Sequence, residues 1–173
     1  MARRRKPMQD ESTLIHREFS SDRSFDAVVA AFEAAVGPGD GKTFQSVVDK
    51  ATNAENFVAS VRAAEGSSGF ILFLKVDHSS WLARVGIGGR ATMYTIGNPL
   101  IAQTMIRHDI EVGLNVPVRV LIYEDAASKT GRIGYDLPSS LMARLKNAEV
   151  TAAAKLLDEK LAALASHSTG SKS

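Results

Sequence analysis

Three short segments carry residues that could transfer protons or hold a small ligand. His78 follows Asp77 at the end of an apolar run, where a histidine is either a satisfied residue at the core edge or a ligand or proton-transfer group. Glu124 ends another apolar run. A carboxylate there is either desolvated, which raises its pKa and suits it to proton transfer, or it simply marks the solvent-exposed end of a strand. Asn98 and Pro99 indicate a capped helix start, which is either ordinary or a site for an anion.

Strands with period-two alternation must position these residues. Along 69–77 this alternation puts one apolar row on the core face and carries His78 to its end. The row consists of Phe70, Leu72, Leu74, Val76 and His78. The complete set of predicted strands covers 12–19, 69–77, 92–96, 117–124 and 132–136.

Helical periodicity and capping residues place the helices in the first third and at the end of the chain. Ser24 is expected to cap a helix that runs to Val36, and Gly37 to end it in a conformation permissive for left-handed geometry. Thr43 or Asn53 can cap further helices. A helix is also expected over 99–108, and a last one after a cap at residue 147.

These elements predict a single α+β domain in which a largely antiparallel sheet of about five strands packs against helices. The domain is expected to span residues 11–166, with a disordered basic tail over 1–10 and a second disordered tail over 167–173. Hairpin connections between neighbouring strands favour the antiparallel arrangement.

Charge and composition exclude several classes of protein. The net charge is +2, but four basic residues at 3–6 supply +4, so the rest of the chain carries −2. A domain that binds the phosphate backbone of nucleic acid would carry Lys and Arg clustered across its folded surface. Here the basic cluster is confined to residues 3–6, so nucleic acid is not an expected partner. The absence of cysteine removes disulfides and thiolate sites. The apolar stretches are too short to span a bilayer, and no signal peptide precedes the domain, so we expect a cytoplasmic protein without a membrane partner.

The sequence motifs indicate no cofactor and no metal site. The segment from Gly37 to Thr43 resembles a phosphate-binding loop, but its glycine spacing is one residue short and it follows a helix. Gly86 to Gly89 lacks the spacing of a dinucleotide fingerprint. No histidine pair has metal-ligand spacing, so no metal is expected.

Four short strings, in this order, resemble the bacterial family called domain of unknown function 302. They are Asp77-His78, the string from Ile96 to Pro99, the string from Val116 to Asp125, and the string from Gly134 to Pro138. The resemblance is strongest over residues 69–138. It implies a single α+β domain with helices on a largely antiparallel sheet, and it implies no reaction. The chain departs from the family at 86–90, before the Gly-Asn-Pro strand, where relatives tend to have a leucine-rich stretch.

Two functions from different classes follow, and a third is compatible with either. The first is a binding module whose pocket, between sheet and helices, holds a small molecule, with anions among the candidates. The residues expected to edge this pocket are His78, Tyr94, Asn98, Glu124 and Tyr135. The alternative is an enzyme in which His78 and Glu124 perform acid/base chemistry, so whether the chain is an enzyme stays open. The third is self-association, such as a homodimer, or binding of another partner.

Overall fold

The computed structural model describes residues 9–171, so residues 1–8 of the expected N-terminal tail and residues 172–173 lie outside the described part. The elements in chain order are β1 (His16–Ser24), α1 (Phe25–Ala35), α2 (Gly41–Lys50), α3 (Ala54–Ala64), β2 (Ile71–Asp77), α4 (His78–Leu82), β3 (Ala91–Gly97), α5 (Pro99–Ile106), β4 (Val118–Glu124), β5 (Thr130–Asp136), α6 (Pro138–Leu141) and α7 (Ala148–Thr169). Short 3-10 turns follow α4, α5 and α6.

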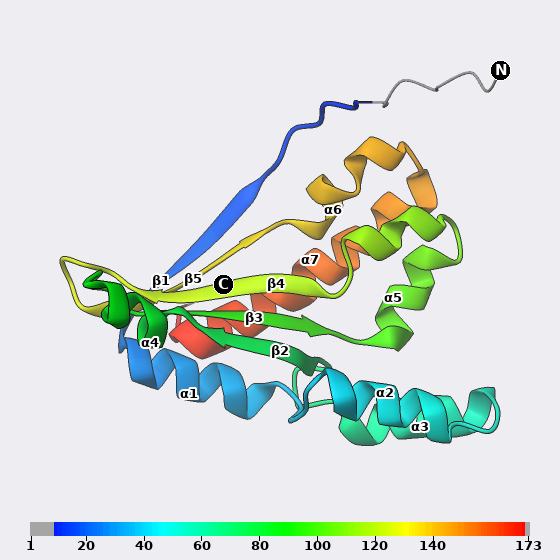
Figure 1. The fold of residues 1–173 in the computed structure, drawn as a ribbon. Helices are drawn as coiled ribbons and strands as arrows, with labels where there is room; N and C mark the ends of the chain where they lie inside the picture. The colour runs from blue at the N-terminus through cyan, green and yellow to red at the C-terminus, as the bar shows by residue number, and fades with distance from the viewer. Residues whose placement is uncertain (1–8, 172–173) are drawn as a thin grey trace, which may run out of the picture.

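The five strands form one antiparallel sheet in the order β1-β5-β4-β3-β2 (Figure 1). The predicted α+β class and the predicted antiparallel sheet are therefore confirmed. β2, β3, β4 and β5 lie within two residues of their predicted bounds. The first strand differs from the predicted 12–19, because pairing with β5 begins at His16 and a bulge carries it on to Ser24.

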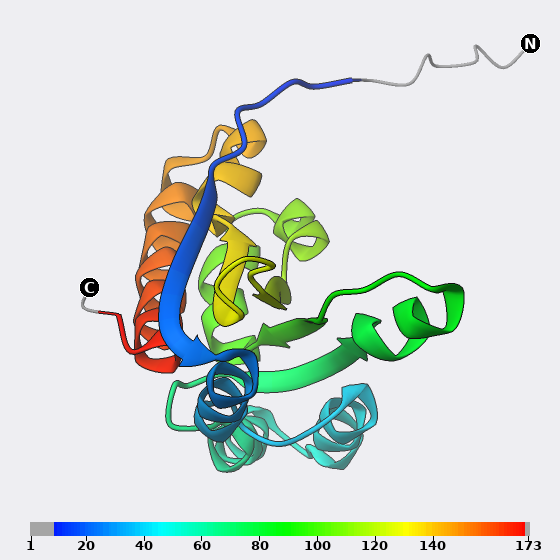
Figure 2. The ribbon, with the colours of Figure 1, turned by 90° about the vertical axis from the view of Figure 1, so that its left-hand side faces the viewer.

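Helices cover one face of this sheet, and α7 lies behind the strands in Figure 1 and alongside β1 in Figure 2. Every second residue of β3 and β4 is buried on the covered face, for example Tyr94 opposite Val120 and Thr92 opposite Ile122. Buried residues of α1, α5 and α7 form one hydrophobic cluster with these rows and remove them from water, which is the main stabilising contribution to such a layered fold.

A bulge in β2 changes which residues of that strand face the core. Leu72 pairs with Ile96 but Leu74 pairs with Thr95, so Phe73 is an extra residue and the alternation inverts after it. Leu74 is consequently 49% exposed, while Lys75 pairs with the buried Tyr94. The predicted single row from Phe70 to His78 is therefore wrong beyond Leu72.

The capping residues are mostly as expected. Ser24 caps α1 by accepting from the Ala27 N–H, and Asn53 caps α3 by accepting from the Asn56 N–H. α2 begins differently, because Asp40 is its cap and Thr43 completes a reciprocal capping box. Asn147 caps α7 as predicted.

Gly37 has a different role from the one expected. Its φ is not left-handed; instead its backbone passes against Gly66, so that both N–H groups donate to the Phe70 carbonyl at 2.8 and 2.9 Å. A Cβ on Gly37 would lie 2.1 Å from the Ala64 carbonyl oxygen. The glycine is thus required by a close approach of two chain segments rather than by a turn.

The C-terminal helix extends into the segment expected to be a tail. α7 continues through residue 169, and Ser168 and Thr169 are buried against the domain. Ser21 donates to the Thr169 carbonyl at 2.6 Å, and Gly170 ends the helix with a φ of 72°. The prediction of a tail from residue 167 is therefore wrong for 167–169, because β1 supplies partners that the helix sequence alone does not reveal.

Candidate functional site

A hollow of about 320 Å³ lies where α5 leaves the sheet, and we call it the apolar pocket. It is close to the lower limit of ligand sites, which run from roughly 300 to 1,000 Å³. Asn98 and Gln103 are the polar side chains in its lining. The lining comprises Phe44, Phe70, Phe73, Ile96, Gly97, Asn98, Pro99, Ile101, Ala102, Gln103, Met105, Ile106, Val116, Pro117, Val118 and Leu157.

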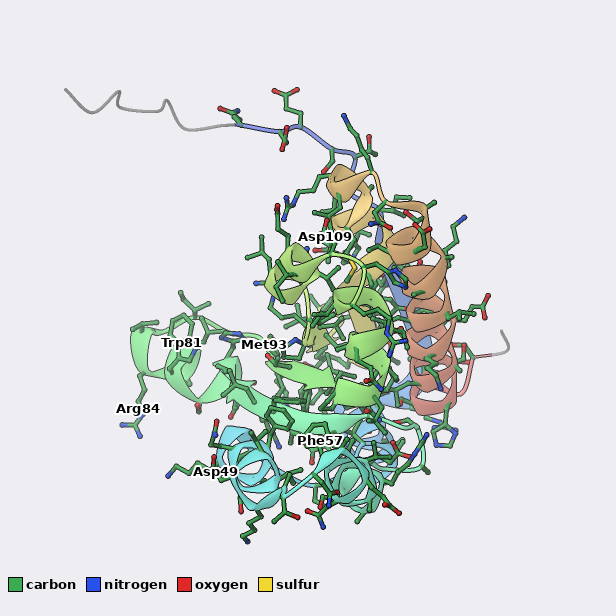
Figure 3. All side chains as sticks on the ribbon, turned by 90° about the vertical axis from the view of Figure 1, so that its right-hand side faces the viewer. Asp49, Phe57, Trp81, Arg84, Met93 and Asp109 are labelled. Atoms are coloured by element: carbon green, nitrogen blue, oxygen red, sulfur yellow. The ribbon has the colours of Figure 1, made fainter. Side chains whose placement is uncertain are left out.

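Segments far apart in the chain build this pocket. α2 contributes Phe44, whose ring lies 5.0 Å from the ring of Phe73 in the β2 bulge. α5 and the segment that leads into β4, residues 116–118, form further walls, and Leu157 of α7 closes the pocket from the core side. Figure 3 looks onto this end of the molecule, where α2, α3, α5 and α7 lie around the strand ends.

Asn98 holds the pocket's edge in place and has no free hydrogen-bond donor for a ligand. Its Oδ1 accepts from the Leu100 N–H at 2.8 Å, and its Nδ2 donates to Glu65 at 2.6 Å and to the Gly69 carbonyl at 2.8 Å. The side-chain amide thereby uses both of its donors. Asn98 is a positioning residue that ties α5 to the end of α3 and the start of β2.

The start of α5 does not offer the donors that an anion would need. Pro99 has no N–H, and the N–H groups of Leu100, Ile101 and Ala102 all donate to Asn98. The Glu65 carboxylate next to Asn98 adds negative charge. The expected anion site at this helix start therefore lacks its chemical basis.

A second hollow, which we call the polar hollow, adjoins the apolar pocket. Its volume is about 350 Å³, and Asn98 and Ile101 line both spaces. The lining comprises Arg62, Glu65, Gly66, Ser67, Ser68, Gly69, Asn98, Leu100, Ile101 and Lys160. Two cationic side chains thus face one carboxylate within it.

Tyr94 does not line the apolar pocket or the polar hollow. It is fully buried, and its hydroxyl donates to Glu33 at 2.7 Å, while the Lys75 ammonium lies 2.6 Å from the same carboxylate oxygen. We call these three residues the Glu33 cluster. Burial and the Glu33 carboxylate raise the pKa of Tyr94, which keeps the phenol protonated. The sequence did not single out Glu33 or Lys75, because the bulge that turns Lys75 inward has no local signal.

We expect the Glu33 cluster to make folding stability depend on pH. Burial raises the pKa of Glu33, but hydrogen bonds from Lys75 and Tyr94 outweigh it, so the pKa is lowered on folding. A carboxyl with a lowered pKa stabilises the fold above its unfolded pKa and loses this contribution as the pH falls through its folded value. At pH 7, Glu33→Gln should therefore cost about 1 kcal/mol, since the pair is partly exposed.

Thermal denaturation of the unmodified protein and of Glu33→Gln, at pH 7 and at acid pH, measures this effect. About 1 kcal/mol corresponds to a melting temperature lower by about 2–4 °C in a domain of this size. The difference in melting temperature should begin to shrink near pH 4.5, the ordinary pKa of a glutamate side chain, and should close as the pH falls through the lower pKa of Glu33 in the folded protein. Glu159→Gln on the exposed side of α7 is the control and should show no difference. A Glu33 difference that persists at acid pH would contradict the charge argument.

His78 and Glu124 lie at the opposite end of β3 from Asn98. His78 begins α4 with Asp77 as its cap, and its Nδ1 accepts from Trp81 Nε1 at 3.1 Å. α4 carries Trp81 away from the covered face, as Figure 3 shows. The Glu124 carboxylate lies 3.8 Å from the Lys129 ammonium. β3 lies between β2, which ends just before His78, and β4, which ends at Glu124. No hydrogen bond joins the two residues within residues 9–171.

Tyr135 is buried in the sheet beside β1 rather than at the apolar pocket. Its ring stacks with Phe19 at 6.2 Å between centroids. Burial raises its pKa to about 12. Its hydroxyl makes no hydrogen bond within the described part of the chain. The expected pocket of five candidates is thus not assembled, and of the five only Asn98 lines the apolar pocket. Tyr94 contacts Glu33, Tyr135 lies beside β1, and His78 and Glu124 lie near the opposite end of β3.

Two features are absent from residues 9–171. No helix there combines the length and the apolar character needed to cross a membrane. Groups of three or more His, Cys, Asp or Glu side chains that could hold a metal ion are also absent from these residues.

Comparison with known proteins gives a family and a fold. The model of the family described as "Domain of unknown function DUF302" matches residues 44–167. The crystal structure of an uncharacterized conserved protein DUF302 from Bacillus stearothermophilus is similar, with a TM-score of 0.62 and 14% sequence identity. The match covers 88% of this chain and 96% of that one, and at this identity it shows the fold alone. No curated protein matches the chain.

Proposed function

The chain belongs to the DUF302 family, and we propose that it is a binding module that takes up small apolar molecules in the apolar pocket. The observation that carries the proposal is the pocket's lining, in which aromatic and aliphatic side chains surround a space of about 320 Å³ beside α5. Burial of apolar ligand surface is favourable by roughly 25 cal/mol per Å², so such a lining suffices for binding without charged groups.

The pocket's polar groups argue for binding rather than for catalysis. Both donors of the Asn98 amide are engaged, with Glu65 and with the Gly69 carbonyl, and its oxygen accepts from the Leu100 N–H. Gln103 is exposed at the rim. A proton-transfer enzyme needs a titratable group within hydrogen-bond reach of its substrate, and the apolar pocket is lined by none.

A titration with the neutral fluorescent probe N-phenyl-1-naphthylamine tests the proposal, because this probe brightens in apolar surroundings. We expect saturable binding with one site per chain. Fluorescence that rises without saturation, or that stays at the level seen in buffer, would refute the proposal. Ala102→Phe, which fills part of the pocket, locates the site.

A second candidate is self-association through the uncovered face of the sheet. Leu74 and Leu121 lie on that face with exposed fractions of 49% and 36%, and Trp81 projects beside it from α4 with 51% exposed. Exposed apolar side chains that gather in this way favour contact with a second copy. Light scattering after size exclusion decides: a mass of 18.5 kDa excludes a stable dimer.

A further inference from the structure

We propose that the ligand is an anionic amphiphile, such as a fatty acid, whose chain fills the apolar pocket while its carboxylate lies in the polar hollow. This inference rests on the proposed function. Its basis is the juxtaposition of the two spaces: Asn98 and Ile101 line both, so an apolar and a charged space adjoin at these residues. A molecule that is apolar at one end and polar at the other fits both at once.

The charges of the polar hollow select the sign of the head group. Glu65 is already engaged, since Arg62 lies 3.1 Å from one of its oxygens and Asn98 donates to the other at 2.6 Å. Lys160 of α7 forms no salt bridge within residues 9–171. The hollow therefore carries a net positive charge, with one ammonium free to meet an anion.

Side chains, rather than the helix start, must hold this head group. The first N–H groups of α5 are occupied by Asn98, so they offer the carboxylate no hydrogen bond. Lys160 reaches the hollow from α7, and Arg62 reaches it from α3. Ser67, which is exposed on the loop between α3 and β2, supplies a hydroxyl donor.

Competition among three ten-carbon compounds tests the head group. Decanoate, decan-1-ol and decylamine share one chain and differ in charge. Against bound N-phenyl-1-naphthylamine at low salt and pH 7.5, decanoate should displace the probe at about fivefold lower concentration than decan-1-ol, since a partly exposed ion pair is worth that much. Decylamine should be the weakest. The advantage of decanoate should shrink as salt is added.

Lys160→Met identifies the cation. It should abolish the advantage of decanoate over decan-1-ol and leave decan-1-ol itself unchanged. Lys155→Met, on the same helix but outside both hollows, is the matched control and should behave like the unmodified protein.

The outcomes separate the two proposals. Without saturable probe binding, the proposed function and this inference both fall. If the probe binds and all three compounds displace it equally, or decylamine displaces it best, the binding function stands and the anionic head group is refuted. Equal behaviour of Lys160→Met and Lys155→Met would likewise refute the assignment to the polar hollow.

Discussion

Gly37→Ala should lower the melting temperature by about 6–12 °C. The new Cβ would lie 2.1 Å from the Ala64 carbonyl oxygen and 2.6 Å from the Gly66 nitrogen, distances that real Cβ atoms do not adopt. Both neighbours are backbone atoms, so no side chain can rotate away. The ends of α1 and α3 must separate, which weakens the paired hydrogen bonds to the Phe70 carbonyl. Overpacking of this kind costs about 3 kcal/mol or more, at roughly 2–4 °C for each kcal/mol.

Gly88→Ala is the matched control for this substitution. A Cβ on Gly88 would meet no heavy atom within 4 Å, and the residue has no left-handed φ. Adding a methyl group there restricts the unfolded chain without a clash, so the melting temperature should stay the same or rise slightly. Calorimetry or circular dichroism on the two variants gives the comparison. An equal, small change in both would show that the crossing of Gly37 and Gly66 is looser than its geometry implies.

Ala102→Phe should weaken binding of N-phenyl-1-naphthylamine by about 60-fold. Ala102 is a half-buried residue of α5 that lines the apolar pocket, and a phenyl ring there occupies part of the 320 Å³ that the probe needs. Excluding one aromatic ring removes about 100 Å² of apolar contact, or about 2.5 kcal/mol at roughly 25 cal/mol per Å². The ring enters the space of the pocket, so the fold keeps its packing.

Ala152→Phe is the control for added hydrophobicity. Ala152 is exposed on α7, away from the pocket, so this variant should bind the probe as the unmodified chain does. Fluorescence titrations of the three proteins, with melting curves to verify that each is folded, provide the measurement. If Ala102→Phe binds the probe normally, the site lies elsewhere and the proposed location is refuted.

Local patterns accounted for much of the fold. Ser24, Asn53, Asn98 and Asn147 cap the helices that their positions predict, because a cap depends on its own side chain and the next three residues. The last four strands follow from alternation and turn residues, which also act over a few residues. Helix ends were less predictable: α7 extends past the expected end because Ser21 of a distant strand pairs with it.

The candidate site was predicted only in part. Asn98 lies at the apolar pocket, but Tyr94 belongs to the Glu33 cluster and Tyr135 lies beside β1. His78 and Glu124 lie near the opposite end of β3. Alternation assigns a face only while the register is unbroken, and the bulge at Phe73 inverts it for the rest of β2.

By itself, the sequence determined the α+β class, the succession of strands and helices, and the Gly-Asn-Pro start of α5, since these depend on neighbours in the chain. Only the tertiary structure decided which side chains meet. The Glu33 cluster joins α1 to β2 and β3, and the apolar pocket joins residues from Phe44 to Leu157. The physical reason is that a pocket is the space left between packed elements, and its shape depends on strand register and helix docking that no local pattern encodes.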